Sequence, residues 1–249
     1  MAVYWDERLM QDDHRSPDVL AEGDSWFSYW IPGNGNLINR FDHDIWKDQY
    51  VLLCIASPGD EAIKMVDGNS RWVLQETLKA YSTIKMLLFS GGGNDIAARH
   101  LLGLLQPDCS GAGNYRACFR EGQPAQRLAE IEHAYRDLIT IRDMCRPEAV
   151  IVTHNYDYAV LGRKLLWMAW LDPYMELAQV PKRLRKDIVA VFIDGLGKML
   201  RGLKQAGFEF VRTSGTLSKA DWANELHPNL EGFGKIARRF RKTLLKHLA

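Results

Sequence analysis

Short apolar segments alternate with longer amphipathic ones along this chain, and no other feature constrains its fold as strongly. Five short segments end in polar or glycine residues, as buried parallel strands do, and they span residues 18–22, 50–56, 84–90, 149–154 and 208–212. Strands that alternate with helices predict a mostly parallel sheet with helices on both faces. We therefore expect an α/β protein with a central sheet of at least five strands.

Three of the longer segments carry apolar residues at spacings of three and four, which is typical of helices that pack on a sheet. The apolar positions are Leu128, Ile131, Tyr135 and Leu138 in the first, Ile188, Phe192, Leu196, Met199 and Leu203 in the second, and Leu230, Phe233, Ala237, Phe240, Leu244 and Leu248 in the third. The third segment also carries basic residues that lie largely outside its apolar stripe, and we interpret them as a solvated face: Arg238, Arg239, Arg241 and Lys242.

The length and composition are those of one α/β domain. A chain of 249 residues, 47% of them apolar, has enough apolar side chains for one large core. Its 32 Lys and Arg residues balance 31 Asp and Glu residues, so the net charge of +1 does not indicate a nucleic acid or an anionic membrane as a partner. We expect a single domain over residues 1–249, with loop insertions at about 107–124 and 156–180 that form walls of a substrate cleft.

Nothing in the sequence predicts a membrane span or a secretory signal. The densest apolar run covers residues 165–171, far short of the roughly 20 residues that cross a bilayer. Acidic residues near the first residue and the lack of an apolar stretch there argue against a signal peptide, so we expect a cytoplasmic protein. The four cysteines match no metal motif and favour reduced thiols, although Cys109 and Cys118 flank a glycine-rich loop and could pair.

The first predicted strand leads directly into the sequence Gly-Asp-Ser-Trp at 23–26. A serine at the carboxyl end of a parallel strand lies where open α/β sheets bind ligands, so Ser25 is a candidate nucleophile. The same residue types are common in turns, so the motif alone has little specificity. It is not the nucleophile elbow of the α/β-hydrolases, because Phe27 stands where that motif has its last glycine.

Two further predicted strands lead into glycine-containing turns. The third strand is followed by Gly-Gly-Gly-Asn-Asp at 91–95, where a ligand can approach the backbone and the Asn94 amide can donate to an oxyanion. The second strand is followed by Ser-Pro-Gly-Asp at 57–60, which places the backbone N–H of Gly59 at the same sheet edge. Taken singly, each segment is also a plain turn, with Asn94 or Asp95 as a helix cap.

A histidine, His227, stands beside Pro228 just before the last predicted helix. A loop histidine can act as a general base when a neighbouring acceptor holds its ring in one tautomer. Glu225, Asn224 and Asp221 precede it by two, three and six residues and are candidate acceptors. A single loop histidine carries little weight, but here it follows three strand-end motifs in a fixed order.

These four blocks together resemble the signature of the SGNH hydrolases, also called the GDSL esterase and lipase family, over nearly the whole chain. In this resemblance Ser25 is the nucleophile, His227 is the base, and Ser25, Gly59 and Asn94 form the oxyanion hole. The resemblance implies a flavodoxin-like three-layer α/β/α sandwich around a mostly parallel five-stranded sheet. It also implies cleavage of a carboxylic ester through an acyl-Ser25 intermediate, with no metal and no organic cofactor.

One position departs from the family pattern. The family usually has Asp three residues before the histidine, and this chain has Asn224. An amide oxygen can still accept the imidazole N–H, but it lacks the charge that stabilises an imidazolium, and the same change in a serine protease costs roughly 10⁴ in kcat. By register Asn224 is the first candidate for this position and Asp221 the second, while Glu225 or a backbone carbonyl stays open.

The expected substrate is a small-molecule, lipid or carbohydrate ester. Asp24 and Trp26 flank the nucleophile and Tyr156 and Asp157 follow the fourth strand, so we predict that these four residues bind substrate, although core packing of the aromatic rings is an equal alternative. A carbohydrate platform is a weaker hypothesis based on Trp26, Trp30, Trp167, Trp170 and Trp222.

Three other functions compete with ester hydrolysis, and one of them is a protein-interaction domain that would bind through the basic C-terminal helix. An SGNH scaffold with a weakened acid position could bind a glycan or acyl group without cleaving it, although Ser25, Asn94 and His227 are all retained. A metal-dependent hydrolase is disfavoured, because the seven histidines show no metal-ligand spacing.

Overall fold

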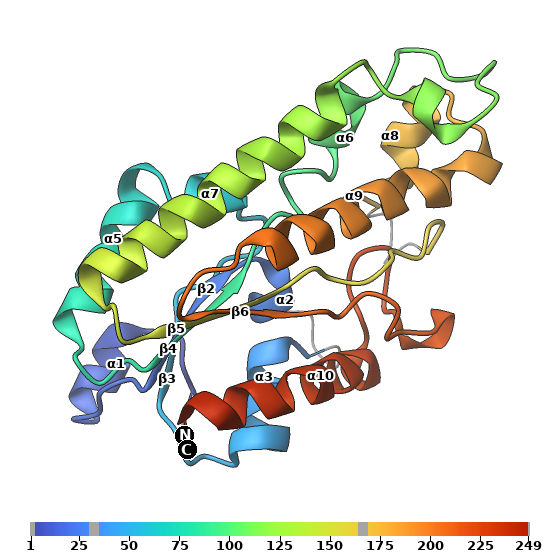
Figure 1. The fold of residues 1–249 in the computed structure, drawn as a ribbon. Coiled ribbons are helices and arrows are strands. Elements are labelled where there is room, and N and C mark those ends of the chain that lie inside the picture. The colour runs from blue at the N-terminus through green and yellow to red at the C-terminus, as the bar shows by residue number, and fades with distance from the viewer. Residues whose placement is uncertain (1–2, 30–34, 164–168, 249) are drawn as a thin grey trace.

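A parallel β-sheet forms the centre of the molecule. The computed structural model describes residues 3–29, 35–163 and 169–248. The sheet has six strands in the order β1-β3-β2-β4-β5-β6, with every neighbouring pair parallel (Figure 1). The strands are β1 (Val3–Tyr4), β2 (Val19–Gly23), β3 (Leu52–Cys54), β4 (Met86–Ser90), β5 (Val150–His154) and β6 (Phe208–Val211).

All five predicted strands are present, with their ends shifted by at most two residues. The expectation of a five-stranded sheet misses one edge strand, β1, which pairs in parallel with β3. This strand is only two residues long, so it contains no apolar period that a sequence could reveal. Because β2, β3 and β4 are buried on both faces, they appear in the sequence as short continuous apolar runs.

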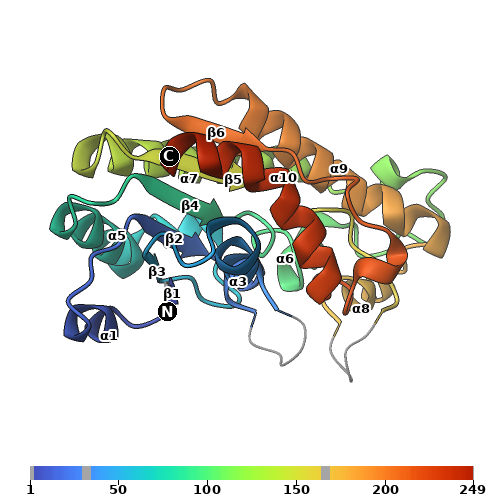
Figure 2. The same ribbon diagram turned by 90° about the horizontal axis from the view of Figure 1, so that it is seen from below.

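Helices cover both faces of the sheet and complete three layers (Figures 1 and 2). One face carries α4 (Ala62–Met65), α5 (Gly68–Ala80), α7 (Gln123–Cys145) and α9 (Lys182–Gly202), which contact one another. The other carries α3 (Leu37–Phe41), the π-helical turn η1 (Asp42–Trp46) and α10 (Leu230–Leu248). The remaining helical segments are α1 (Glu7–Asp12), α2 (Ser25–Ser28), α6 (Arg99–Leu104), η2 (Tyr115–Cys118), α8 (Asp172–Leu177) and η3 (Lys219–Asp221).

The three predicted amphipathic helices are α7, α9 and α10. Their predicted stripes are buried at most positions, including Tyr135 on α7 and Phe192 on α9. On α10 the stripe is buried from Phe233 to Leu248, but Leu230, the first residue of the helix, is 47% exposed. The four basic residues at 238–242 are exposed on the opposite side of α10, as expected for a solvated face.

The two predicted insertions contain local structure. Segment 107–124 includes η2, and segment 156–180 includes α8. Residues 164–168, and with them Trp167, lie outside the described residues, as does Trp30. Cys109 and Cys118 are free thiols, and the Cys109 Sγ–H donates a weak hydrogen bond to the Cys118 carbonyl oxygen at 3.4 Å. No helix within 3–29, 35–163 and 169–248 is both long enough and apolar enough to cross a bilayer.

The parallel arrangement brings the strand-end motifs together. The backbone N–H of Asp24 donates to the Ser90 carbonyl at the end of β4, and the N–H of Ser57 after β3 donates to the Gly23 carbonyl. Gly23 lies so close to β4 that an added Cβ would stand 2.9 Å from the Ser90 side chain, so only glycine fits there. The turns after β2, β3 and β4 therefore meet at one edge, where open α/β sheets bind ligands.

Candidate active site

Ser25 begins the short helix α2 directly after β2. The side chain of Asp24 caps this helix by accepting the backbone N–H of Trp26 at 3.0 Å. The backbone N–H groups of a first helical turn have no partner within the helix, so the N–H of Ser25 is a donor beside its own hydroxyl. The sharp change from strand to helix turns the hydroxyl toward the loop that carries His227.

The hydroxyl of Ser25 contacts the imidazole of His227, with 2.7 Å between Oγ and Nε2. His227 is 5% exposed, and its burial lowers the pKa of the imidazole to about 3. The ring is therefore neutral at neutral pH, as a general base must be before it takes a proton.

The other ring nitrogen, Nδ1, lies 3.0 Å from Oδ1 of Asn224. The same oxygen accepts the backbone N–H groups of Leu226 and His227, each at 2.9 Å. Since a backbone N–H can only donate, the atom facing it must be the amide oxygen and not the nitrogen. An amide oxygen can only accept, so Nδ1 carries the ring proton and Nε2 is free to accept from Ser25.

Tyr29 holds both Asn224 and His227. The Asn224 Nδ2 group donates to the Tyr29 hydroxyl at 2.7 Å. The Tyr29 ring also stacks on the His227 ring, with 4.0 Å between centroids and 9° between planes. Trp170 meets the imidazole edge-on at a centroid distance of 5.5 Å. The sequence analysis missed Tyr29, because its partners lie some 200 residues along the chain and a tyrosine four residues after a serine has no recognisable spacing.

The two carboxylates near His227 point elsewhere. Asp221, the second sequence candidate, accepts hydrogen bonds from Ser218 and from Lys235 Nζ at 2.6 Å, and so caps η3. Glu225 is fully buried and accepts the backbone N–H groups of residues 170–172. The choice of Asp221 is therefore corrected: its carboxylate stabilises the loop, and the partner of the imidazole is Asn224.

Asn94 lines the same pocket as Ser25 and His227. Its Nδ2 donates to the Asp60 carbonyl oxygen at 2.9 Å, which fixes the amide and leaves its second N–H for a ligand. Gly59, in the turn after β3, has a φ of +92°, a conformation that favours glycine. It precedes Asp60, so the predicted oxyanion glycine and asparagine belong to two turns that are bonded to each other.

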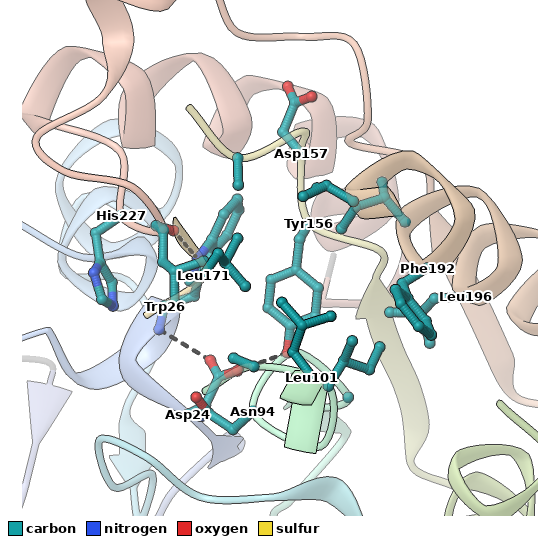
Figure 3. A pocket seen from close by; sticks show the side chains of 18 of the residues that line it. Asp24, Trp26, Asn94, Leu101, Tyr156, Asp157, Leu171, Phe192, Leu196 and His227 are labelled. Carbon is teal, nitrogen blue, oxygen red and sulfur yellow. Dashed lines mark hydrogen bonds between the residues drawn. The ribbon is translucent and has the colours of Figure 1, made fainter. Parts of the chain in front are cut away.

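Asp24, Trp26, Tyr156 and Asp157, the predicted substrate-binding residues, all line the pocket (Figure 3). Their polar groups, however, form internal hydrogen bonds. Asp24 accepts from Ser90 Oγ at 2.9 Å and from the Tyr156 hydroxyl at 2.6 Å.

The other two residues are held in the same way. Trp26 Nε1 donates to the Leu226 carbonyl oxygen at 3.0 Å, and Asp157 accepts three backbone N–H groups of residues 215–217. Burial raises the pKa of Asp24 to about 6, although its hydrogen bonds act in the opposite direction. These contacts indicate that the four polar groups hold the neighbouring segments together, while the side chains form part of the pocket wall.

The pocket itself has a cavity volume of about 80 Å³ and extends from the catalytic edge to α9. Figure 3 shows Trp26 and His227 at one side and Phe192 and Leu196 of α9 at the other. The apolar lining comes from Ile96, Ala97, Leu101, Ala159, Leu171, Ile188, Val189, Phe192, Ile193, Leu196 and Leu226. Within the described parts of the chain, no cluster of His, Cys, Asp and Glu side chains could hold a metal ion.

No family model matches the chain, and no curated protein matches it in sequence. Among solved structures, a lipase from a goat rumen metagenome is similar with a TM-score of 0.58 at 15% identity, covering 93% of this chain and 99% of the lipase. A carbohydrate acetylesterase from Sinorhizobium meliloti is similar with a TM-score of 0.55 at 13% identity, over 92% and 98% of the two chains. A GDSL-like lipase from Parabacteroides merdae is similar with a TM-score of 0.52 at 14% identity, over 91% of this chain and 95% of the lipase. At these identities the likeness shows a shared fold.

Proposed function

We propose that this chain, which has the α/β/α fold of the SGNH hydrolases, is a carboxylic ester hydrolase that uses Ser25 as its nucleophile. The observation that carries the proposal is the chain of contacts from Ser25 Oγ to His227 Nε2 at 2.7 Å and from His227 Nδ1 to Asn224 Oδ1 at 3.0 Å. Ser25 and His227 line a pocket that also contains Asn94. A nucleophile, an oriented base and an amide donor are the parts that acyl transfer requires.

In the first step the Ser25 oxygen attacks the ester carbonyl carbon, and His227 Nε2 takes the hydroxyl proton. The carbonyl electron pair moves onto its oxygen, which the N–H groups of Ser25, Gly59 and Asn94 stabilise. When the tetrahedral intermediate collapses, the alcohol leaves with the proton from His227, and acyl-Ser25 remains. Water then attacks the acyl-enzyme by the same route and releases the carboxylic acid.

In this mechanism Asn224 orients the imidazole but supplies no negative charge beside it. The two backbone N–H groups and Tyr29 fix the amide, so His227 is held in the productive tautomer. The Tyr29 ring at 4.0 Å gives the imidazolium a cation–π partner during the transition state. Stacking by Tyr29 and orientation by Asn224 therefore replace part of the stabilisation that a carboxylate would give the imidazolium.

Hydrolysis of p-nitrophenyl acetate by the wild type, Ser25→Ala and Ser28→Ala tests this proposal. Ser28 lies in the same short helix, and its hydroxyl bonds to the Asp24 carbonyl, so Ser28→Ala is a matched control. We expect loss of turnover in Ser25→Ala alone. Equal turnover in all three proteins would contradict the role of Ser25.

The second candidate is a binding module on the same scaffold, favoured by the uncharged Asn224 beside the imidazole. Such a module would bind an acyl or glycan ligand in the pocket but give no turnover and no acylated Ser25. Ligand binding with an intact ester after long incubation would support it over the hydrolase.

A further inference from the structure

The wall of the pocket opposite the catalytic edge is formed by α9. Successive turns of this helix present Ile188, Val189, Phe192 and Leu196 to the cavity, and all four are at most 9% exposed. Ile96, in the segment after β4, and Leu101 of helix α6 also line the cavity, and Figure 3 shows Leu101. Apart from Asp24, Ser25, Asn94, Asp157 and His227, the side chains that line the cavity are aliphatic or aromatic.

The two carboxylates that line the cavity are already paired. The Asp24 carboxylate is bonded to Tyr156, Ser90 and Trp26, and the Asp157 carboxylate to residues 215–217. A sugar or another hydroxylated group in this cavity would lose its water partners without new ones, which is costly. A hydrocarbon chain would instead exchange water for apolar contacts, which is favourable for each methylene.

We propose that this cavity holds the saturated acyl chain of the ester substrate, and that the preferred substrates are acyl esters longer than acetate. The inference rests on the proposed hydrolase function. The carbonyl would stand between Ser25 and Asn94, the chain would run along α9, and the alcohol would face the open side. The α9 residues Val189 and Phe192 then determine acyl specificity.

A chain-length series with a constant alcohol tests the inference: p-nitrophenyl acetate, butyrate, hexanoate and octanoate, all below their solubility limits. Burial of one methylene is worth roughly a fourfold gain, so we expect kcat/KM to rise by about tenfold or more from acetate to butyrate and to rise or level off beyond it. A maximum at acetate, or a flat series, would overturn the assignment.

Two variants of α9 locate the effect. Val189→Phe adds bulk to the cavity wall, whereas Val191→Phe makes the same change on a part of α9 outside this pocket. We expect Val189→Phe to lower kcat/KM for hexanoate at least tenfold more than kcat/KM for acetate. In Val191→Phe the ratio of the hexanoate kcat/KM to the acetate kcat/KM should equal that of the wild type. Equal ratios in both folded variants would refute the role of this wall.

A binding measurement separates this inference from the proposed function. Calorimetry on Ser25→Ala with sodium octanoate and sodium acetate needs no catalysis, and we expect octanoate to bind at least tenfold more tightly. Octanoate binding in a protein that hydrolyses no ester would reject the hydrolase and keep the acyl cavity. Turnover of acetate esters with equally weak binding of both acids would keep the hydrolase and reject the acyl cavity.

Discussion

Replacement of Asn224 by Asp isolates the contribution of charge to this site. In serine proteases the reverse change costs about 10⁴ in kcat, partly because the histidine then adopts the wrong tautomer. Here the amide oxygen already accepts the backbone N–H groups of Leu226 and His227, so the tautomer is correct before the substitution. Only the missing charge remains to be restored in Asn224→Asp.

The magnitude follows from the distance. Asn224 Oδ1 and His227 Nδ1 are 3.0 Å apart, so the centres of charge of a carboxylate and an imidazolium would be separated by ~4 Å, and at an effective dielectric constant of about 20 they attract by about 4 kcal/mol. The existing amide dipole already supplies part of this, so we expect a net lowering of the barrier by about 2 kcal/mol, or an increase in kcat of about 30-fold. The variant should fold, since the new carboxylate keeps two backbone donors and Tyr29 can rotate its O–H to donate to the second oxygen.

The pH dependence gives a second readout. His227 must be neutral to act as base, and burial lowers its pKa to about 3, so wild-type kcat/KM is present above that pH and is lost as the pH falls through it. A carboxylate at 224 favours the imidazolium and raises the pKa, so the acid limb should move upward by about 1.5 pH units.

The matched control is Asn229→Asp, which adds the same charge at the N-terminus of α10, two residues beyond His227. Steady-state kinetics from pH 3 to 8 with one ester compares the proteins. The reasoning is refuted if folded Asn224→Asp has wild-type kcat and an unmoved acid limb, or if Asn229→Asp shows the same gain.

Three further changes have defined outcomes. Asn94→Ala should lower kcat by about 10² to 10³ with an unchanged circular dichroism spectrum, because an oxyanion donor is lost; wild-type kcat would remove Asn94 from the mechanism. Tyr29→Phe keeps the stacked ring but leaves Asn224 Nδ2 without its partner, so kcat in an ester assay should fall several-fold. If the hydroxyl acts through the amide, Tyr29→Phe should lower kcat less in the Asn224→Asp background than in the wild type, and an equal loss in both backgrounds would contradict this role. Burial raises the pKa of Glu22 to about 8, so the free energy of unfolding should fall progressively as the pH rises from about 4.5 to about 8. Thermal melts should therefore show that Glu22→Gln gains Tm over the wild type, and that this gain grows across the same pH window. A difference in Tm that stays constant with pH would contradict this.

The strands and the order of the catalytic blocks could be predicted because each is a local pattern. Buried parallel strands are short apolar runs, and parallel topology sends their carboxyl ends to one edge, which brings Ser25 and Asn94 together. Asn224 was predicted from the resemblance to the SGNH hydrolases, whose pattern has its acidic residue three positions before the histidine, and its Oδ1 lies 3.0 Å from His227 Nδ1.

The remaining features depend on contacts between distant segments. Tyr29 meets Asn224 and His227 only after β2 and the loop before α10 come together. The stripe at Ile188 and Phe192 predicted a helix packed on the sheet, but apolar spacing cannot distinguish residues that fill a core from residues that line a cavity. Nor could it show that Asp24 and Asp157, placed beside the pocket, would use their carboxylates internally.

Covalent labelling tests the central claim most directly. The wild type, Ser25→Ala and Ser28→Ala are treated with a fluorophosphonate, the intact masses are measured and the modified peptide is sequenced. The account predicts one adduct per chain on Ser25 in the wild type and in Ser28→Ala, and none in Ser25→Ala. An unmodified wild-type protein that is folded, or an adduct on another residue, would contradict the assignment of Ser25 as an activated nucleophile.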